Sequence, residues 1–93
     1  MAKTLFGLAF GRAAAEFLDR MPSGKIRAQV AKRAKALINN PHPPGCKKLS
    51  GKKSGEEAVW RVRSGDYRIL YLVRNNPNEV IVLDIDNRKD VYR

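Results

Sequence analysis

Four arginines in the second half of the chain have the clearest potential for chemistry: Arg61, Arg63, Arg68 and Arg88. Guanidinium groups bind phosphate oxygens through paired hydrogen bonds and stay charged at any physiological pH. They can also stabilise the extra negative charge of a phosphoryl transition state by a few kcal/mol per well-placed donor. Tyr92 follows this set and could stack on a base or donate a proton. These residue types predict contact with the phosphates of a polyanion.

Each of these residues also has a simpler interpretation. The strand arginines would form a solvated face, with Arg68 paired to Asp66 or Asp84, and Tyr92 would be a packing residue. Three further aromatic residues are interpreted as core: Trp60, Tyr67 and Tyr71.

Metal and nucleophile chemistry find little support. The chain has one histidine, His42, and one cysteine, Cys46, which by themselves cannot build a zinc site. Both belong to a proline-rich stretch without a nearby carboxylate to orient them for nucleophilic catalysis. Asp84 and Asp86 could share a strand face and hold Mg²⁺, but balancing the charge of neighbouring basic residues is the more usual role. We therefore expect no metal and no cofactor.

The element that carries three of the arginines is a predicted β-hairpin, residues 60–73. Two apolar-rich runs flank Ser64-Gly65-Asp66, which favours a turn. Side chains alternate between the faces of a strand, so Arg61 and Arg63 point away from Trp60 and Val62. We predict that the turn sets a register in which Arg68 joins Arg61 and Arg63 on one face.

The residues before the hairpin predict one strand and two helices. A short apolar run over residues 4–10 is typical of a buried strand. Apolar residues at helical spacing predict a helix over 12–21, which Pro22 ends. Ser23 then provides an N-cap for a second helix, which ends before Pro41. This helix has an apolar stripe at helical spacing, made of Ile26, Val30, Ala34, Leu37 and Ile38. Its basic residues lie elsewhere around the helix: Lys25, Arg27, Lys32, Arg33 and Lys35. The two helices are expected to form a hairpin against a sheet.

A crossover loop is predicted from Pro41 to about Ala58, and a last strand over residues 80–85. Four lysines of the loop are expected to attract a nucleic-acid backbone: Lys47, Lys48, Lys52 and Lys53. The order is βααβββ, an α+β fold with two N-terminal helices on a mostly antiparallel four-stranded sheet. Residues 1–93 are expected to form a single domain.

Charge is the unusual feature of the composition. The 93 residues include 19 Lys+Arg and 9 Asp+Glu, a formal charge of +10. Self-repulsion of this size is usually retained for an anionic partner, such as a nucleic acid or an acidic protein. No apolar run reaches the ~20 residues of a membrane span, and no signal peptide is recognised. With a single cysteine, a reducing cytoplasmic location is expected.

Several motifs resemble the RelE/ParE superfamily of toxin–antitoxin toxins, and its RelE branch most closely. They are Lys48-Leu49-Ser50-Gly51, Trp60-Arg61-Val62-Arg63, Gly65-Asp66-Tyr67-Arg68-Ile69-Leu70-Tyr71 and Asn87-Arg88-Lys89-Asp90-Val91-Tyr92-Arg93. The resemblance implies a compact α+β toxin that cleaves mRNA in the ribosomal A site without a metal. It also implies a cognate antitoxin as partner, besides mRNA and the ribosome.

The resemblance implies roles for individual residues. Arg68 matches the arginine that stabilises the scissile phosphate, and Arg88 matches the arginine after the last strand. Tyr92 matches the C-terminal tyrosine that stacks on or activates the nucleotide. Arg61 and Arg63 occupy basic positions of the family, where lysine is common. Two alternatives stay open: a ParE-like inhibitor of DNA gyrase, and a non-catalytic nucleic-acid-binding module.

Overall fold

The computed structural model describes residues 6–54, 57–75 and 77–87, and the side chains of 50–54 lie outside this description. In chain order the elements are β1 (Gly7–Phe10), α1 (Arg12–Arg20), α2 (Gly24–Ala36), β2 (Lys47–Ser54), β3 (Glu57–Ser64), β4 (Tyr67–Arg74) and β5 (Glu79–Asn87). The predicted α+β class is confirmed. The sheet has five strands where four were expected.

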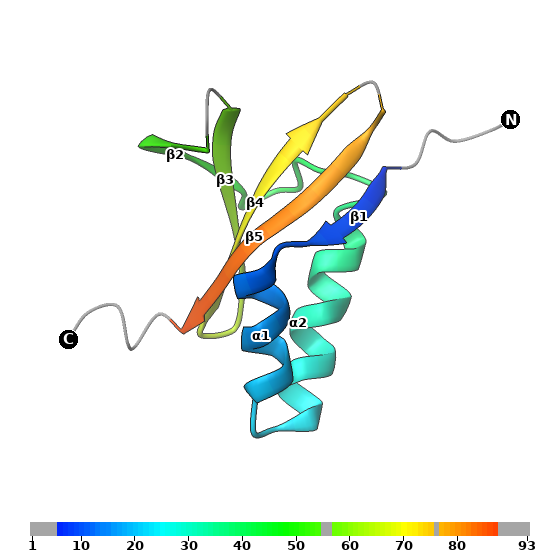
Figure 1. Ribbon diagram of the computed structural model, residues 1–93, viewed down its shortest axis with the longest axis vertical. Coiled ribbons are helices and arrows are strands. Elements are labelled where there is room, and N and C mark those ends of the chain that lie inside the picture. The colour runs from blue at the N-terminus through cyan, green and yellow to red at the C-terminus, as the bar shows by residue number, and fades with distance from the viewer. Residues whose placement is uncertain (1–5, 55–56, 76, 88–93) are drawn as a thin grey trace, which may run out of the picture.

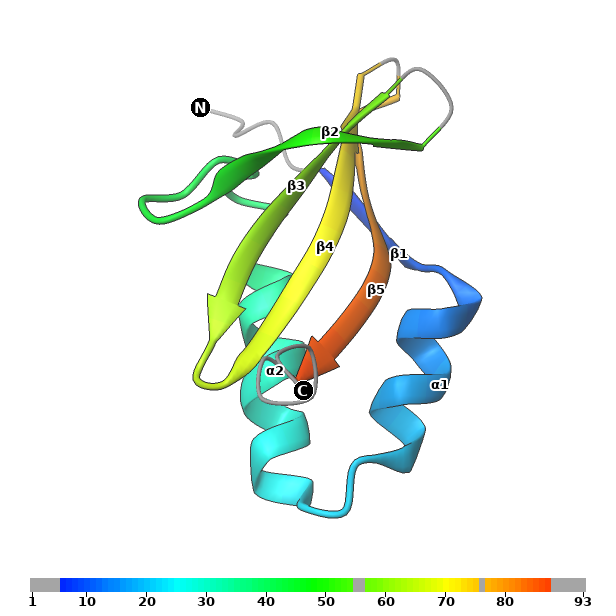
Figure 2. The same ribbon diagram turned by 90° about the vertical axis from the view of Figure 1, so that its left-hand side faces the viewer.

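The strands form one mixed sheet in the order β1-β5-β4-β3-β2. β1 pairs with β5 in parallel, and the other neighbours are antiparallel. Both helices lie against the same face, where α1 contacts β5 and α2 contacts β3 (Figures 1 and 2). The sheet therefore has a face packed on helices and an opposite face, which we call the open face.

The two helices follow the sequence signals. Ser23 caps α2, since its Oγ accepts a hydrogen bond from the Ile26 amide at 3.2 Å. Val30, Ala34 and Leu37, part of the predicted apolar stripe, are fully buried. They pack in the main core with side chains of β3, β4 and β5. This packing fixes the helix-facing side of the sheet, and strand alternation then decides what reaches the open face.

The strand missed by the sequence prediction is β2. Its residues are lysine, glycine and serine with a single leucine, a composition that does not favour strands. It pairs at the edge of the sheet, where only the backbone needs a partner, and its register with β3 shifts between Lys48 and Lys53. Leu49 packs against a second apolar cluster formed by Val59, Leu70 and Leu72. Edge pairing therefore overrides the low strand propensity of this segment.

Candidate functional site

The hairpin register brings the three predicted arginines to one face. β3 and β4 are joined by Gly65-Asp66, with Gly65 at φ 60°, and Arg63 lies directly opposite Arg68. Residues opposite one another on antiparallel strands point to the same face. Arg61, two residues before Arg63, shares that face. The predicted common face of Arg61, Arg63 and Arg68 is therefore confirmed, and it is the open one.

Two rows of paired residues cross the open face. The first runs from β2 to β5 as Lys47, Arg61, Leu70 and Asp84. The second comprises Arg63, Arg68 and Asp86. Basic residues thus occupy β2 and β3, and the two carboxylates lie together on β5. The open face is electrostatically graded, from positive at the β2 edge to acidic on β5.

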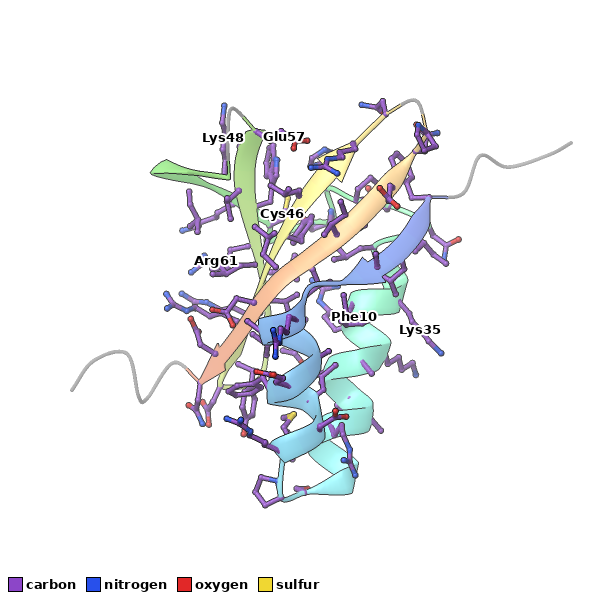
Figure 3. All side chains as sticks on the ribbon, viewed as in Figure 1. Phe10, Lys35, Cys46, Lys48, Glu57 and Arg61 are labelled. Atoms are coloured by element: carbon purple, nitrogen blue, oxygen red, sulfur yellow. The ribbon has the colours of Figure 1, made fainter. Side chains whose placement is uncertain are left out.

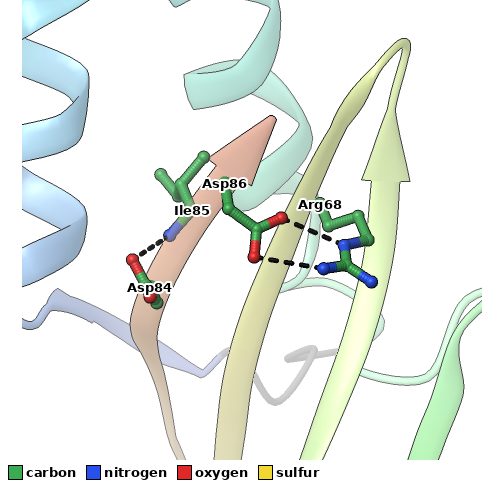
Figure 4. A network of polar contacts seen from close by, with 4 residues as sticks. All are labelled: Arg68, Asp84, Ile85 and Asp86. Atoms are coloured by element: carbon green, nitrogen blue, oxygen red, sulfur yellow. Dashed lines mark hydrogen bonds and ion pairs between the residues drawn. The ribbon is translucent and has the colours of Figure 1, made fainter. Parts of the chain in front are cut away.

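Arg68 forms an ion pair with its cross-strand neighbour Asp86 (Figure 4). Its Nε donates to Oδ1 at 3.0 Å and its Nη2 donates to Oδ2 at 3.3 Å. The two side chains are 20% and 28% exposed, so the pair is partly shielded from water. Asp84 instead accepts a hydrogen bond from the Ile85 amide at 2.8 Å. Arg68 therefore pairs with Asp86, a partner that the sequence analysis did not suggest.

Arg61 and Arg63 line a pocket of about 280 Å³ with Lys47, Gly45 and Arg33. Arg61 is only 8% exposed, whereas Arg63 is exposed. Arg33 reaches the pocket from α2, where its Nε donates to the backbone carbonyl of Arg63 at 3.3 Å. Sequence reasoning missed this role of Arg33, because helical spacing placed it only among several basic residues away from the apolar stripe.

The predicted loop lysines divide between the two faces. Lys47 lies opposite Arg61 and shares the open face, whereas Lys48 lies opposite Trp60, on the other face. The side chains of Lys52 and Lys53, and all of Arg88 and Tyr92, lie outside the described residues. Of the predicted basic residues, the structure thus brings Lys47 together with Arg61, Arg63 and Arg68.

The predicted aromatic core lies on the helix-facing side. Tyr71 is fully buried, and Trp60 and Tyr67 pack against the same cluster. The Tyr71 hydroxyl donates to the Pro41 carbonyl at 2.6 Å, and burial raises its pKa well above the ordinary value of 10.0. The His42 ring contacts the Trp60 ring at an interplanar angle of 59°, with centroids 4.4 Å apart. These aromatic residues anchor the 41–46 loop to the sheet.

The predicted sharing of a face by Asp84 and Asp86 is confirmed by their partners in β4. Within the described residues, no group of three or more histidine, cysteine or acidic side chains is placed to hold a metal ion. In the same part of the chain, no helix is long and apolar enough to cross a bilayer.

Sequence comparison shows the family. A family model described as "ParE toxin of type II toxin-antitoxin system, parDE" matches residues 8–92. The toxin RelE of Mycobacterium tuberculosis (strain ATCC 25618 / H37Rv) is 32% identical over 88 residues, which cover 95% of this chain and 87% of that protein. This chain belongs to the RelE/ParE superfamily of type II toxin–antitoxin toxins. Within it, the similarity is to the RelE branch.

Solved structures of the superfamily have the same fold. The toxin–antitoxin complex RelBE2 of Mycobacterium tuberculosis contains a chain that matches with a TM-score of 0.76 and 26% identity, covering 94% of this chain and 95% of that one. The archaeal RelE–RelB complex of Pyrococcus horikoshii OT3 matches with a TM-score of 0.74 and 21% identity, covering 90% and 96%. The expected toxin fold is thus confirmed over nearly the whole chain.

Proposed function

We propose that this toxin is a metal-independent endoribonuclease that cleaves mRNA on the ribosome and so inhibits translation. The observation that supports the proposal best is the common open face of Arg61, Arg63 and Arg68, joined by Lys47. A row of cations on a sheet face suits the backbone of an extended RNA strand. The proposal is also supported by the motif around Arg68, in which Arg68 matches the family arginine that stabilises the scissile phosphate.

The proposed reaction uses the substrate's own 2′-hydroxyl as nucleophile. The 2′-oxygen bonds to the adjacent phosphorus while the bond to the 5′-oxygen of the next nucleotide breaks. One proton leaves the 2′-hydroxyl and one is delivered to the 5′-oxygen, giving a 2′,3′-cyclic phosphate and a 5′-hydroxyl. Arg68 stabilises the charge that accumulates on the phosphorane oxygens. The protein therefore needs to orient the RNA, neutralise charge and move protons.

Proton transfer is assigned to Tyr92 in this proposal, because arginine is a poor acid or base at neutral pH. Arg88 is assigned to the phosphate on the basis of its motif. Asp86 holds the Arg68 guanidinium through two hydrogen bonds. Because a bidentate pair fixes both position and orientation, Asp86 acts as a positioning residue for Arg68.

A cognate antitoxin is proposed as the protein partner. The related structures named above are toxin–antitoxin complexes. The formal charge of +10 favours an antitoxin segment that is acidic or amphipathic and covers the basic face. Such a segment would compete with RNA for Arg61, Arg63 and Lys47. Cytoplasmic activity is proposed because translating ribosomes are there.

The test is cleavage of a defined mRNA on purified translating ribosomes, followed by mapping of the new 5′ ends. We expect cuts within codons in the A site, 5′-hydroxyl ends, and no cut when the nucleotide bearing the attacking hydroxyl is 2′-deoxy. Fragments that appear equally without ribosomes would contradict ribosome dependence. Intact mRNA at every toxin concentration would contradict the nuclease.

The second candidate, inhibition of DNA gyrase, is favoured by the description of the matched family model, a ParE toxin. It predicts inhibited supercoiling by purified gyrase and a DNA-damage response, with no mRNA cleavage. RNA binding that weakens steeply with salt, without cleavage or gyrase inhibition, would favour the non-catalytic module.

A further inference from the structure

The basic pocket beside the open face has an unusual lining. It combines Arg61 and Arg63 from β3, Lys47 from the start of β2, Arg33 from α2 and Gly45 from the turn before β2. Four of these five residues are cationic and none is acidic. Like charges held close together repel, so such a set is usually retained for an anion.

The position of Arg33 follows from the edge of the sheet. Pairing between β2 and β3 begins at Lys47 and Arg61, so β2 does not continue alongside Arg63. Arg33 occupies this edge and donates its Nε–H to the Arg63 carbonyl at 3.3 Å. This bond uses one donor of the guanidinium, and arginine has five. The helix thus brings a further cation to the pocket at a fixed position.

Size and rigidity also suit a phosphate. The pocket volume of about 280 Å³ is several times the ~30 Å³ that a water molecule occupies in the liquid. Arg61 is 8% exposed, so its side chain is confined before any ligand binds. Gly45 adopts φ 92°, and no heavy atom lies within 4 Å of the place where a Cβ would be. The rim is therefore open to an incoming group.

The pocket extends from Arg63, opposite Arg68, to Lys47 at the β2 edge of the sheet. Arg68 lies on β4 and Lys47 on β2, and two strand spacings amount to about 9.5 Å. Arg63 lies between them and contributes to the pocket while standing opposite Arg68. An RNA strand that places one phosphate at Arg68 can therefore place a neighbouring phosphate in the pocket.

We propose that the pocket formed by Arg33, Lys47, Arg61 and Arg63 is a second phosphate site, which binds the RNA backbone next to the reacting phosphate, with Arg33 as a substrate-positioning residue. The proposal rests on the proposed function for its choice of RNA as ligand. The pocket itself is proposed to bind a phosphodiester, and this binding does not require that the RNA be cut.

Arg33→Gln tests the site, because glutamine keeps hydrogen-bonding capacity but removes the charge. Lys35→Gln is the matched control: it removes one charge from the same helix, and Lys35 points away from the side of Arg61 (Figure 3). The ligand is a short single-stranded RNA with 2′-O-methyl groups, which cannot react. Its affinity is measured over a range of salt concentrations, after thermal unfolding has verified that each variant is folded.

We expect Arg33→Gln to weaken binding by about tenfold and to reduce the slope of log K against log salt by ~0.7, the value for one lost phosphate contact on a single strand. Lys35→Gln should leave the slope within error of the unchanged protein. In NMR titrations with inorganic phosphate, the Arg33 and Arg61 Nε–H signals should shift. Equal slopes for the two variants would overturn the site. Loss of affinity for an acidic antitoxin peptide alone, with RNA binding unchanged, would also overturn it.

Discussion

Replacement of Asp86 by asparagine should separate RNA binding from RNA cleavage. The Asp86 carboxylate accepts hydrogen bonds from Nε and Nη2 of Arg68 at 3.0 and 3.3 Å. Asparagine has nearly the same shape but one acceptor and no charge, and its amide NH₂ would face the guanidinium. The substitution therefore removes a charge-assisted pair while keeping the volume of the side chain.

Its effect on stability follows from exposure. Fully exposed ion pairs contribute about 0–1 kcal/mol, and hydrogen bonds to charged groups about 1.5–3 kcal/mol. With side chains 20% and 28% exposed, this pair lies between those limits. We expect Asp86→Asn to lower the free energy of unfolding by about 1–2 kcal/mol, which for a domain of this size lowers Tm by about 4–16 °C.

Asp86→Asn should strengthen the binding of RNA but slow its cleavage. Loss of a carboxylate beside Arg68 makes the open face more positive, so unreactive RNA should bind more tightly and with a steeper salt dependence. Arg68 loses the group that orients it, so cleavage on saturated ribosomes should slow by about 10–100-fold, as expected for a misplaced stabilising group.

Asp84→Asn is the matched control. It removes the same charge from the same strand and face, but its carboxylate accepts from the Ile85 amide and takes no part in the Arg68 pair. We expect it to raise RNA affinity in a similar way while leaving cleavage at saturation within about threefold. Equal cleavage rates for the two variants would refute the positioning role of Asp86.

Two further perturbations test the anchoring of the loop and the division of the lysines. Tyr71→Phe removes the 2.6 Å hydrogen bond to Pro41, which should lower the free energy of unfolding by about 1–2 kcal/mol at neutral pH. The folded pKa of Tyr71 is raised above 10.0, so its contribution to the free energy of unfolding is complete below pH 10 and is lost as the pH rises toward the folded pKa. In urea unfolding between pH 8 and 11, the free energy of unfolding should therefore fall less for Tyr71→Phe than for the unchanged protein. Equal decreases would contradict the burial of the Tyr71 hydroxyl. Lys47→Gln should reduce the slope of log K against log salt for single-stranded RNA by ~0.7, and Lys48→Gln should reduce it by much less, since only Lys47 shares the face of Arg61. Filter binding measures both slopes. A larger reduction for Lys48→Gln than for Lys47→Gln would contradict the assigned interface.

Sequence alone was sufficient for the hairpin and for the face of its arginines. The Ser64-Gly65-Asp66 break predicts a tight connection. The apolar side chains Val62 and Ile69 are buried on the same face only if the strands pair in one of the two possible side-chain alternations. That constraint also sends Tyr71 to the core and Arg68 to the open face. Local chemistry and alternation thus determined the three-arginine face.

The rest depended on long-range contacts that leave no local pattern. β2 pairs through its backbone at a sheet edge, and its lysines carry no alternating apolar signal. The β4–β5 register, which shifts between Leu70 and Tyr71, places Asp86 rather than Asp84 opposite Arg68. Arg33 enters the site through a hydrogen bond to Arg63, which lies 30 residues later in the sequence. Charge counting along a helix could not distinguish it from its basic neighbours.

The central claim is that the arginine face of β3 and β4 cleaves RNA, and Arg68→Ala tests it most directly. Arg74→Ala is the control, because Arg74 lies in the same strand and pairs with Glu57, six residues or about 20 Å from Arg68. The measurement is the single-turnover rate of mRNA cleavage on programmed ribosomes, with folding verified for both variants. We expect Arg68→Ala to lose at least ~100-fold and Arg74→Ala to cleave at the unchanged rate. A folded Arg68→Ala variant that cleaves as fast as Arg74→Ala would contradict the account.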